Sequence, residues 1–153
     1  MTVLLGSSGV CWSADFQKGR DAYKREDYAT ALKEWTPLAE QGDASAQHNL
    51  GLMHERGRGV PQDYQTAVKW YILAAGQGDA DAQTNLGFMY EKGQGVPQDY
   101  KTAVKWYTLA AEQGYAPAQF NLGLMYDNGQ GVPQDDKTAV KWFTLAAEQG
   151  YAP

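Results

Sequence analysis

The sequence contains little cysteine, little histidine and no long apolar run. Its 153 residues include one cysteine, Cys11, and two histidines. A single thiol forms neither an intramolecular disulfide nor, on its own, a zinc site. No segment approaches the roughly 20 apolar residues that a membrane-spanning helix needs. These absences exclude a small disulfide-stabilised scaffold, and they predict that the chain has no membrane span.

Positive charge is also scarce. The chain has 13 lysines and arginines against 18 aspartates and glutamates, which gives a net charge of −5. The cations are scattered singly or in pairs, whereas nucleic acids and anionic lipid surfaces attract clustered basic residues. We therefore expect no nucleic acid among the partners. Apolar residues make up 43% of the chain, which is enough for a packed core and argues against global disorder.

Candidate catalytic and metal-binding groups are few. His48 and His54 are six positions apart on one expected helix, so their side chains point to different faces. The H-E-x-x-H and C-x-x-C motifs are missing, and the G-Q-G-V-P-Q segments lack the Gly-Lys-Ser/Thr of a phosphate-binding loop. We therefore predict a protein that is not an enzyme and has no catalytic residues, no metal site and no cofactor.

What the sequence does contain is a repeat. The segment GVPQDYKTAVKW at 95–106 recurs as GVPQDYQTAVKW at 59–70 and as GVPQDDKTAVKW at 131–142, so the copies are 36 residues apart. Residues 63–98 and 99–134 are identical at 27 of 36 positions. Self-similarity at such a period is the signature of a repeat architecture.

Each copy contains two helix patterns, for example at 43–55 and 63–75. Asp63, Asp99 and Asp135 stand where an N-cap residue accepts hydrogen bonds from free backbone N–H groups. Glycine and proline separate the helices, and no segment alternates as a strand does. A single helix pair cannot bury its apolar face, so successive pairs must stack. The predicted fold is therefore an all-α solenoid of stacked helix-turn-helix repeats.

The chain is expected to form a single array after a short leader. The start is apolar and rich in small residues, like a signal peptide, but it lacks the basic region. The sequence stops at EQGYAP, where another first helix should begin, so we expect a C-terminal truncation. The expected parts are a degraded signal-peptide-like or disordered segment at 1–14, one array at 15–153, its first unit at 15–42, and helix pairs at about 43–76, 79–112 and 115–148.

The repeat motif resembles the Sel-1-like repeat (SLR) family, a branch of the tetratricopeptide (TPR) superfamily. The motif reads A-x-A-Q-x-N-L-G-x-M-Y, then G-x-G-V-x-x-D, then A-V-x-W-Y/F-x-x-A-A-x-x-G. Residues 15–42 are similar to a plain TPR unit without the RGVP-type insertion. The resemblance implies a right-handed superhelix with a concave groove, used as a scaffold for partner proteins and often found in bacteria. The motif is carried by Ala46, Leu50, Gly51, Gly57, Gly59, Val60, Ala67, Trp70, Tyr71, Ala74 and Ala75 and by their counterparts 36 and 72 residues later.

One side of each first helix is the predicted partner-binding groove. On a helical wheel it lies opposite the stripe with Leu50 and Met53 that should face the paired helix. In the TPR-like fold this side lines the concave groove. It mixes apolar and charged residues, which is typical of a binding surface. We call the following set the groove face: Ser45, His48, Leu52, Glu55, Arg56, Asp81, Thr84, Phe88, Glu91, Lys92, Phe120, Leu124, Asp127 and Asn128.

Alternative roles exist for the aromatic and apolar positions. Leu52, Phe88 and Leu124 could instead be buried against the adjacent helix pair. We expect Phe120 to be the better anchor for a partner, because its counterparts His48 and Thr84 are polar. The recurring aromatics could form a ligand-binding ladder, but their spacing with alanines favours packing between repeats. These aromatics are Trp70, Trp106, Trp142, Tyr71, Tyr107 and Phe143.

The resulting hypothesis is a bacterial adaptor, periplasmic or secreted, with a cytoplasmic location as the alternative. It would hold a peptide or partner protein in its groove. Two other hypotheses remain: a cell-wall or β-lactam-associated binding or hydrolytic protein, like cysteine-rich relatives, and a structural spacer in a longer array. This chain lacks the cysteines of those relatives. Self-association is also possible through the last second helix, where Trp142, Phe143 and Leu145 include residues that a further helix would bury.

Overall fold

The computed structural model describes residues 14–151, and within this range it contains eight α-helices and no strand. Nearly all of the expected leader, including Cys11, lies outside the described residues. No helix in the described range is both long and apolar enough to cross a membrane. The helices are α1 (Phe16–Lys24), α2 (Tyr28–Glu40), α3 (Ala44–Arg56), α4 (Tyr64–Gly76), α5 (Ala80–Lys92), α6 (Tyr100–Glu112), α7 (Ala116–Asn128) and α8 (Asp136–Glu148).

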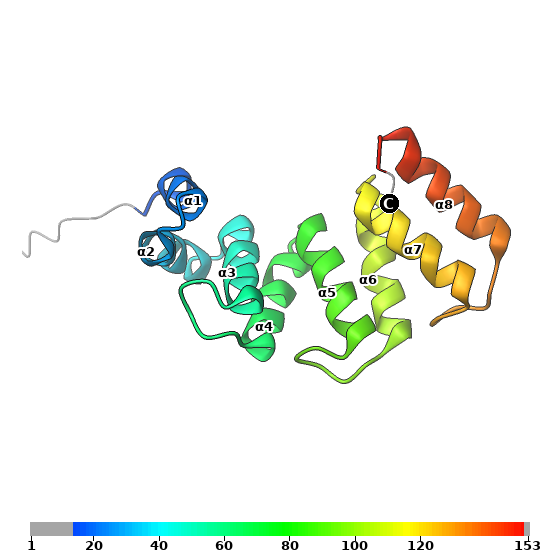
Figure 1. Cartoon of the computed structure of the whole chain (residues 1–153), viewed down its shortest axis with the longest axis horizontal. Coiled ribbons are helices and arrows are strands. Elements are labelled where there is room, and N and C mark those ends of the chain that lie inside the picture. The colour runs from blue at the N-terminus through cyan, green and yellow to red at the C-terminus, as the bar shows by residue number, and fades with distance from the viewer. Residues whose placement is uncertain (1–13, 152–153) are drawn as a thin grey trace, which may run out of the picture.

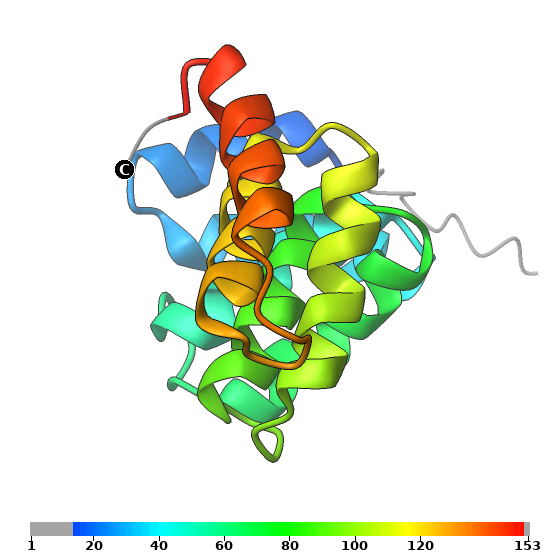
Figure 2. The same ribbon diagram turned by 90° about the vertical axis from the view of Figure 1, so that its right-hand side faces the viewer.

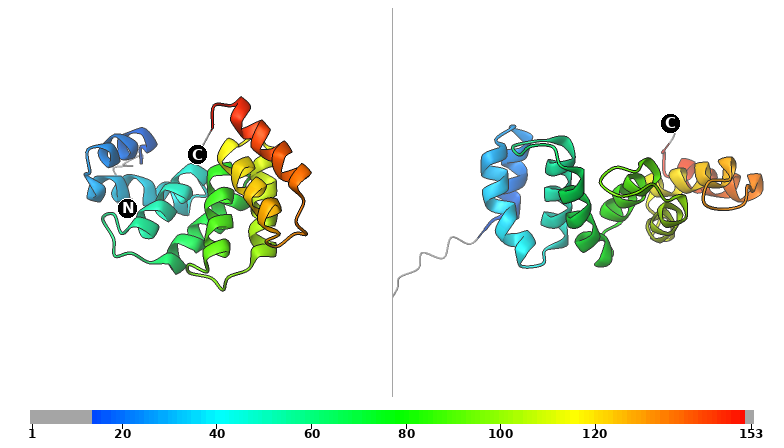
Figure 3. Two further views of the ribbon diagram at one scale, coloured as in Figure 1. Left: turned by 45° about the vertical axis from the view of Figure 1, so that its right-hand side comes forward. Right: turned by 90° about the horizontal axis from the view of Figure 1, so that it is seen from below.

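The helices pack mainly against their neighbours in sequence, as pairs that stack on one another (Figure 1). The pairs are α1 with α2, α3 with α4, α5 with α6, and α7 with α8. The stack follows a curved path, so that α1 and α8 lie toward the same side of the molecule (Figure 3, left). In the end-on view of Figure 2, α8 is the nearest helix to the viewer. The predicted all-α solenoid of helix-turn-helix repeats is confirmed.

The second helix of each repeat begins at an aspartate N-cap, as the sequence predicts. Asp99 Oδ1 accepts hydrogen bonds from the N–H groups of Lys101 at 3.0 Å and Thr102 at 3.2 Å. The Thr102 hydroxyl donates to Asp99 Oδ2 at 2.6 Å. Asp63 and Asp135 make the corresponding bonds. These threonine contacts hold the pKa of each capping carboxyl below its usual range.

Two glycine positions explain much of the repeated motif. A Cβ at Gly87 of α5 would lie 2.7 Å from the ring of Tyr107, so glycine lets this buried ring lie against the helix backbone. Gly95, in the loop before α6, has a φ of 72°, and a Cβ there would lie 2.4 Å from the carbonyl oxygen of Tyr64. Both positions therefore need glycine, one for packing within a pair and the other for contact with the preceding pair.

Buried glutamines link successive pairs. Gln83 Nε2 donates to the carbonyl oxygen of Ala75 at 3.1 Å, and Gln83 Oε1 accepts from Gln113 Nε2 at 2.7 Å. Because Gln83 is almost fully buried, these bonds satisfy polar atoms that would otherwise be costly to bury. The same two bonds recur in the set Gln47, Ala39 and Gln77 and in the set Gln119, Ala111 and Gln149.

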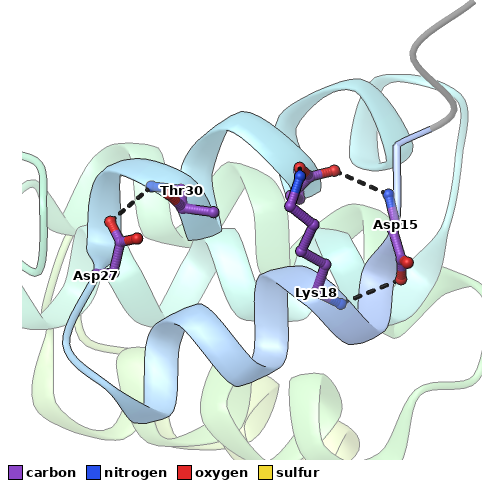
Figure 4. Close-up of polar contacts among 5 residues, drawn as sticks. Asp15, Lys18, Asp27 and Thr30 are labelled. Carbon is purple, nitrogen blue, oxygen red and sulfur yellow. Dashed lines mark hydrogen bonds and ion pairs between the residues drawn. The ribbon is translucent and has the colours of Figure 1, made fainter.

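The first pair contains a charged contact at its N-terminal end. The buried Glu34 of α2 accepts from the Asp15 N–H at 3.0 Å and from Lys18 Nζ at 2.5 Å. The hydrogen bond from Lys18 lowers the pKa of Glu34. Figure 4 shows Lys18 and Asp15 beside these bonds, and Asp27 capping α2 through the Thr30 N–H at 3.1 Å. An ion pair therefore ties the start of α1 to α2.

Candidate partner-binding groove

The groove face is carried by α3, α5 and α7, which are the first helices of three successive repeats. Its apolar row consists of Leu52, Phe88 and Leu124, one residue per repeat. Phe88 is 38% exposed and Leu124 is 37% exposed. Leu52 is half-buried and packs against the core formed by α4 and α5. Two of the three apolar residues are therefore accessible to a partner.

A row of carboxylates, Glu55, Glu91 and Asp127, lies beside the apolar row. The Tyr107 hydroxyl donates to Glu91 Oε2 at 2.8 Å, and the Tyr71 hydroxyl donates to Glu55 Oε2. Burial is the main cause that raises the pKa of both tyrosines, so they remain neutral donors. These bonds hold each carboxylate over the second helix of its own pair. In the last repeat the aromatic is Phe143, which has no hydroxyl group to donate.

The cationic positions differ from repeat to repeat. Lys92 Nζ lies 2.5 Å from Glu91 Oε1 and 5.6 Å from the centre of the Phe88 ring. Arg56 is the exposed counterpart in α3, and the neutral Asn128 is the exposed counterpart in α7. The charge on the groove face therefore changes along the stack, because the residue after the carboxylate is a cation in α3 and α5 and a neutral amide in α7.

His48 lies partly inside the molecule. Its Nε2 is 3.1 Å from Asn85 Nδ2, and its ring centre is 5.9 Å from that of Tyr71. Burial lowers the pKa of this histidine. The contact with Asn85 joins α3 to α5, so His48 contributes to the packing between repeats as well as to the groove face.

The burial of Thr84 removes the reason to expect Phe120 to be a better anchor than Phe88 or Leu124. Thr84, the counterpart of Phe120, is only 8% exposed, and its hydroxyl is satisfied by donating to the Ala80 carbonyl oxygen at 2.7 Å. A polar residue at this position is therefore compatible with burial, contrary to our expectation. Phe120 is itself half-buried, with its ring centre 5.4 Å from that of Phe143 and 5.8 Å from that of Tyr151.

The remaining groove-face residues are mostly exposed. Ser45, Asp81 and Asp127 are exposed, and Asp81 accepts a hydrogen bond from the Tyr115 hydroxyl at the start of α7. Burial is the main cause that raises the pKa of Tyr115. Asp81 thus links its repeat to the next one. Within the described range, no group of three or more histidine, cysteine, aspartate or glutamate side chains is placed to hold a metal ion.

The recurring aromatics pack between repeats, as their spacing with alanines indicated, and do not form a ligand-binding ladder. Tyr71 and Tyr107 are fully buried, and the three tryptophans are half-buried. Trp70, Trp106 and Trp142 each pack against a core cluster that joins the first helix of their own pair to the second helix of the preceding pair. Packing between repeats therefore explains why these residues recur.

A signal in the repeat itself marks the groove face, although the sequence analysis did not use it. Helices α5 and α7 have thirteen residues each and differ at five positions. All five lie on the predicted groove side of the first helix, while the other eight positions are identical. The variation between these two copies is therefore confined to one side of the first helix. The differing pairs are Asp81 and Pro117, Thr84 and Phe120, Phe88 and Leu124, Glu91 and Asp127, and Lys92 and Asn128.

Comparison with known proteins places the repeat in one family. A family model described as the Sel1 repeat matches residues 44–79, 80–115 and 116–151, which together make up more than half of the chain. A search of curated proteins found no match to this chain.

Solved structures of repeat proteins are similar over most of the chain. A Sel1 repeat protein from Oxalobacter formigenes has a TM-score of 0.85 and 38% identity, over 89% of this chain and 56% of that protein. A protective antigen of uropathogenic Escherichia coli with an SLR fold has a TM-score of 0.83 and 40% identity, over 91% of this chain and 32% of that protein. This chain therefore spans only part of each of these two proteins.

A third structure shows similarity of fold alone. Cysteine-rich protein B of Helicobacter pylori has a TM-score of 0.62 and 22% identity, over 87% of this chain and 91% of that protein.

Proposed function

Because the chain belongs to the Sel1 repeat family, we propose that it is a non-enzymatic adaptor that holds a peptide or partner protein against its groove face. Repeat proteins of this kind build extended surfaces from many similar units, and function is carried by side chains on that surface. The proposal concerns the groove face because accessible apolar residues and varied charges occur together there.

The main support is the position of the differences between α5 and α7. The core residues Leu86, Gly87 and Met89 of α5 have identical counterparts in α7, while the five positions that differ all lie on the groove side. On this side the exposed Phe88 and Leu124 lie among charged residues, a combination that is typical of a binding surface. A partner with its own irregular surface would be recognised by different side chains in successive repeats. The pattern therefore favours recognition of one extended partner by several repeats.

The contacts suggest how such a partner is held. Apolar side chains of the partner would cover Phe88 and Leu124, which gives affinity by removing apolar surface from water. Arg56, Lys92 and Asp127 would then select among partners by charge, since charges at the rim of an interface mainly affect specificity and association rate. The partner should carry apolar residues flanked by charged ones.

Affinity capture from an extract of the producing cell tests this proposal. The bait is the whole chain, compared with a Phe88→Ser, Leu124→Ser variant. The matched control is a Leu73→Ser, Leu109→Ser variant, because these leucines are exposed apolar residues on the second helices. Circular dichroism first establishes that all three baits are equally helical. Phe120 is left intact because it packs against Phe143.

We expect one protein to be retained by the native chain and the control, and its retention to fall by more than about tenfold on the groove variant. Retention of the same proteins by all three baits would contradict the proposal. That result would favour the alternative in which this chain is a spacer in a longer array.

Export from a bacterial cell is a further part of the proposal. It is supported by the apolar, small-residue-rich start of the sequence, residues 1–14. Fractionation of cells that produce the chain with and without these residues tests it. If the chain is exported, the full chain should be found in the periplasm or medium and the shortened chain in the cytoplasm. The same distribution for both chains would contradict export.

The outer face of α8 offers a second surface for another protein. Val140 is exposed there, and this supports the expectation that copies of the chain could meet through this face. Sedimentation velocity over a range of concentrations tests self-association. A monomer that persists at high micromolar concentration would contradict it.

A further inference from the structure

Helix α5 carries a complete arrangement of an apolar side chain, a carboxylate and a cation on the groove face. Lys92 Nζ lies 2.5 Å from Glu91 Oε1 and 5.6 Å from the centre of the Phe88 ring. The second oxygen of this carboxylate, Glu91 Oε2, accepts a hydrogen bond from the Tyr107 hydroxyl at 2.8 Å. Both carboxylate oxygens are therefore occupied from within the repeat, and the cation lies beside an exposed apolar ring.

Helix α7 keeps the apolar side chain and the carboxylate but lacks the two groups that occupy the carboxylate in α5. Its apolar residue is Leu124, which is 37% exposed, and its carboxylate belongs to the exposed Asp127, one turn further along the helix. The cation is replaced by Asn128 and the tyrosine by Phe143. Across residues 14–151, no group forms a hydrogen bond or an ion pair with the Asp127 carboxylate. An unpaired carboxylate therefore lies beside an exposed leucine.

Helix α3 shows that this combination is specific to α7. The Glu55 carboxylate accepts a hydrogen bond from the Tyr71 hydroxyl, and the next residue is the exposed cation Arg56. A second cation brought to α3 or α5 would meet a positive charge that is already there. A cation brought to α7 would meet only a negative one.

A further repeat of the array would not supply the missing cation. Within the described part of the stack, the side chains of Glu55 and Glu91 form hydrogen bonds and ion pairs only with residues of their own helix pair. Both of these residues have a following repeat, which begins with α5 or α7, and neither carboxylate is reached by it. A group that pairs with Asp127 must therefore approach from the groove side.

We propose that the α7 part of the groove face binds a lysine or arginine side chain of the partner protein, held between Asp127 and Leu124. This side chain would take the place that Lys92 occupies in α5. The stem of a lysine or arginine covers apolar surface while its charged end pairs with a carboxylate, so one such residue fits both groups. The inference rests on the proposed function and names the chemistry of the partner: a basic residue next to the apolar residue that covers Leu124.

Synthetic peptides are the probe. Each contains two phenylalanines joined by a spacer of about three to eight glycine and serine residues, which spans about 10–26 Å when extended. A lysine is placed next to one phenylalanine or next to the other, and the matched peptide has glutamine in place of the lysine. Binding to the whole chain is followed by fluorescence polarisation at about 20 mM salt, where exposed charges are weakly screened.

Three single variants each raise the net charge of −5 by one, so they separate a local charge pair from long-range attraction. Asp127→Asn removes the carboxylate. Asn128→Lys places a cation next to the carboxylate, as in α5. Gln65→Lys is the matched control, because this exposed position of α4 is occupied by Lys101 and Lys137 in the later repeats. Circular dichroism establishes that all the chains are equally helical.

We expect the lysine peptides to bind the native chain about two- to fivefold more tightly than the glutamine peptides, the usual effect of one exposed charge pair. The Gln65→Lys chain should show the same preference. The Asp127→Asn and Asn128→Lys chains should bind the two kinds of peptide equally.

The inference is overturned if the native chain shows no preference for lysine, or if the Asp127→Asn chain keeps the preference. Loss of the preference in all three variants would also overturn it, because net charge would then be the explanation. Absence of binding by every peptide up to about 1 mM would count against both this inference and the proposed function.

A Phe88→Ser, Leu124→Ser chain distinguishes the two kinds of failure. If this chain loses the peptides while the native chain shows no preference for lysine, the groove face is the binding surface and only the present inference fails. If it binds every peptide as tightly as the native chain does, the groove face is not the binding surface and the proposed function fails as well.

Discussion

At the scale of single residues, stability depends on close contacts between glycine and aromatic rings. The ring of Tyr107 occupies the space where residue 87 would carry a Cβ. The same contact occurs between Gly51 and Tyr71 and between Gly123 and Phe143. Each first helix therefore approaches its partner helix more closely than any larger residue allows.

Gly87→Ala should lower the free energy of unfolding by about 1–3 kcal/mol, the usual cost of overpacking a core. Gly76→Ala is the matched control, because Gly76 also lies in a helix but has no atom within 4 Å of its added Cβ. The control should gain up to about 1 kcal/mol from its higher helix propensity. Urea denaturation measures both. Equal changes in the two variants would contradict the packing explanation.

Because of its two partly buried histidines, the chain should lose stability at mildly acidic pH. Burial lowers the pKa of both His48 and His54, so the folded chain binds protons less readily than the unfolded chain. Their contribution to the free energy of unfolding is therefore complete above the pKa of histidine in the unfolded chain, about 6.5, and declines as the pH falls through this value. The midpoint temperature of thermal unfolding should fall less between pH 7.5 and pH 5.5 for a His48→Gln, His54→Gln variant than for the native chain. An unchanged pH dependence would contradict this assignment.

At the scale of helices, most boundaries follow from local chemistry and could be predicted. The aspartate caps of α4, α6 and α8 occupy the positions expected from the sequence. The contacts between helices were less predictable. A helical wheel gives the side on which Thr84 or Gln83 lies, but it does not tell which backbone atoms of a neighbouring helix come within reach. The buried glutamine links and the burial of Thr84 were missed for that reason.

Removal of one cap should weaken one helix without changing the fold. Asp99→Ala removes the acceptor for the N–H groups at the start of α6 and should cost about 1 kcal/mol. Asp99→Asn retains an acceptor and should cost much less. Chemical denaturation with retained circular dichroism measures the difference. If Asn and Ala are equally destabilising, the cap bond is not what stabilises this end of α6.

At the scale of the whole molecule, the stack is a series of neighbour contacts with unequal ends. An internal pair is covered on both sides, whereas α8 is covered on one side only. The sequence predicted the all-α stack from its 36-residue period and placed the groove face on the first helices. For the C-terminal end the sequence indicated Trp142, Phe143 and Leu145 as residues that include those a further helix would bury. In the folded chain Leu145 is no more exposed than its counterparts, whereas Val140, which the sequence did not single out, is 61% exposed where Val68 and Val104 are 4% and 9% exposed.

The uncovered end predicts a gradient of local stability. Amide hydrogen exchange in α8 should be at least about tenfold faster than at the equivalent positions of α6, because α8 has fewer packed neighbours to lose when it opens. Mass spectrometry of peptides from the two helices measures the rates. Equal protection of α6 and α8 in a monomeric sample would contradict this view of the stack.

Site-specific photo-crosslinking tests the central claim, that the groove face holds a partner, most directly. A photoreactive phenylalanine derivative replaces Phe88 of α5 in one version of the chain and Leu73 of α4 in another, and both are irradiated in the producing cell. Both positions are exposed and apolar. The account predicts one dominant protein adduct from position 88 and none from position 73. The same adducts from both positions, or a dominant adduct only from position 73, would contradict it.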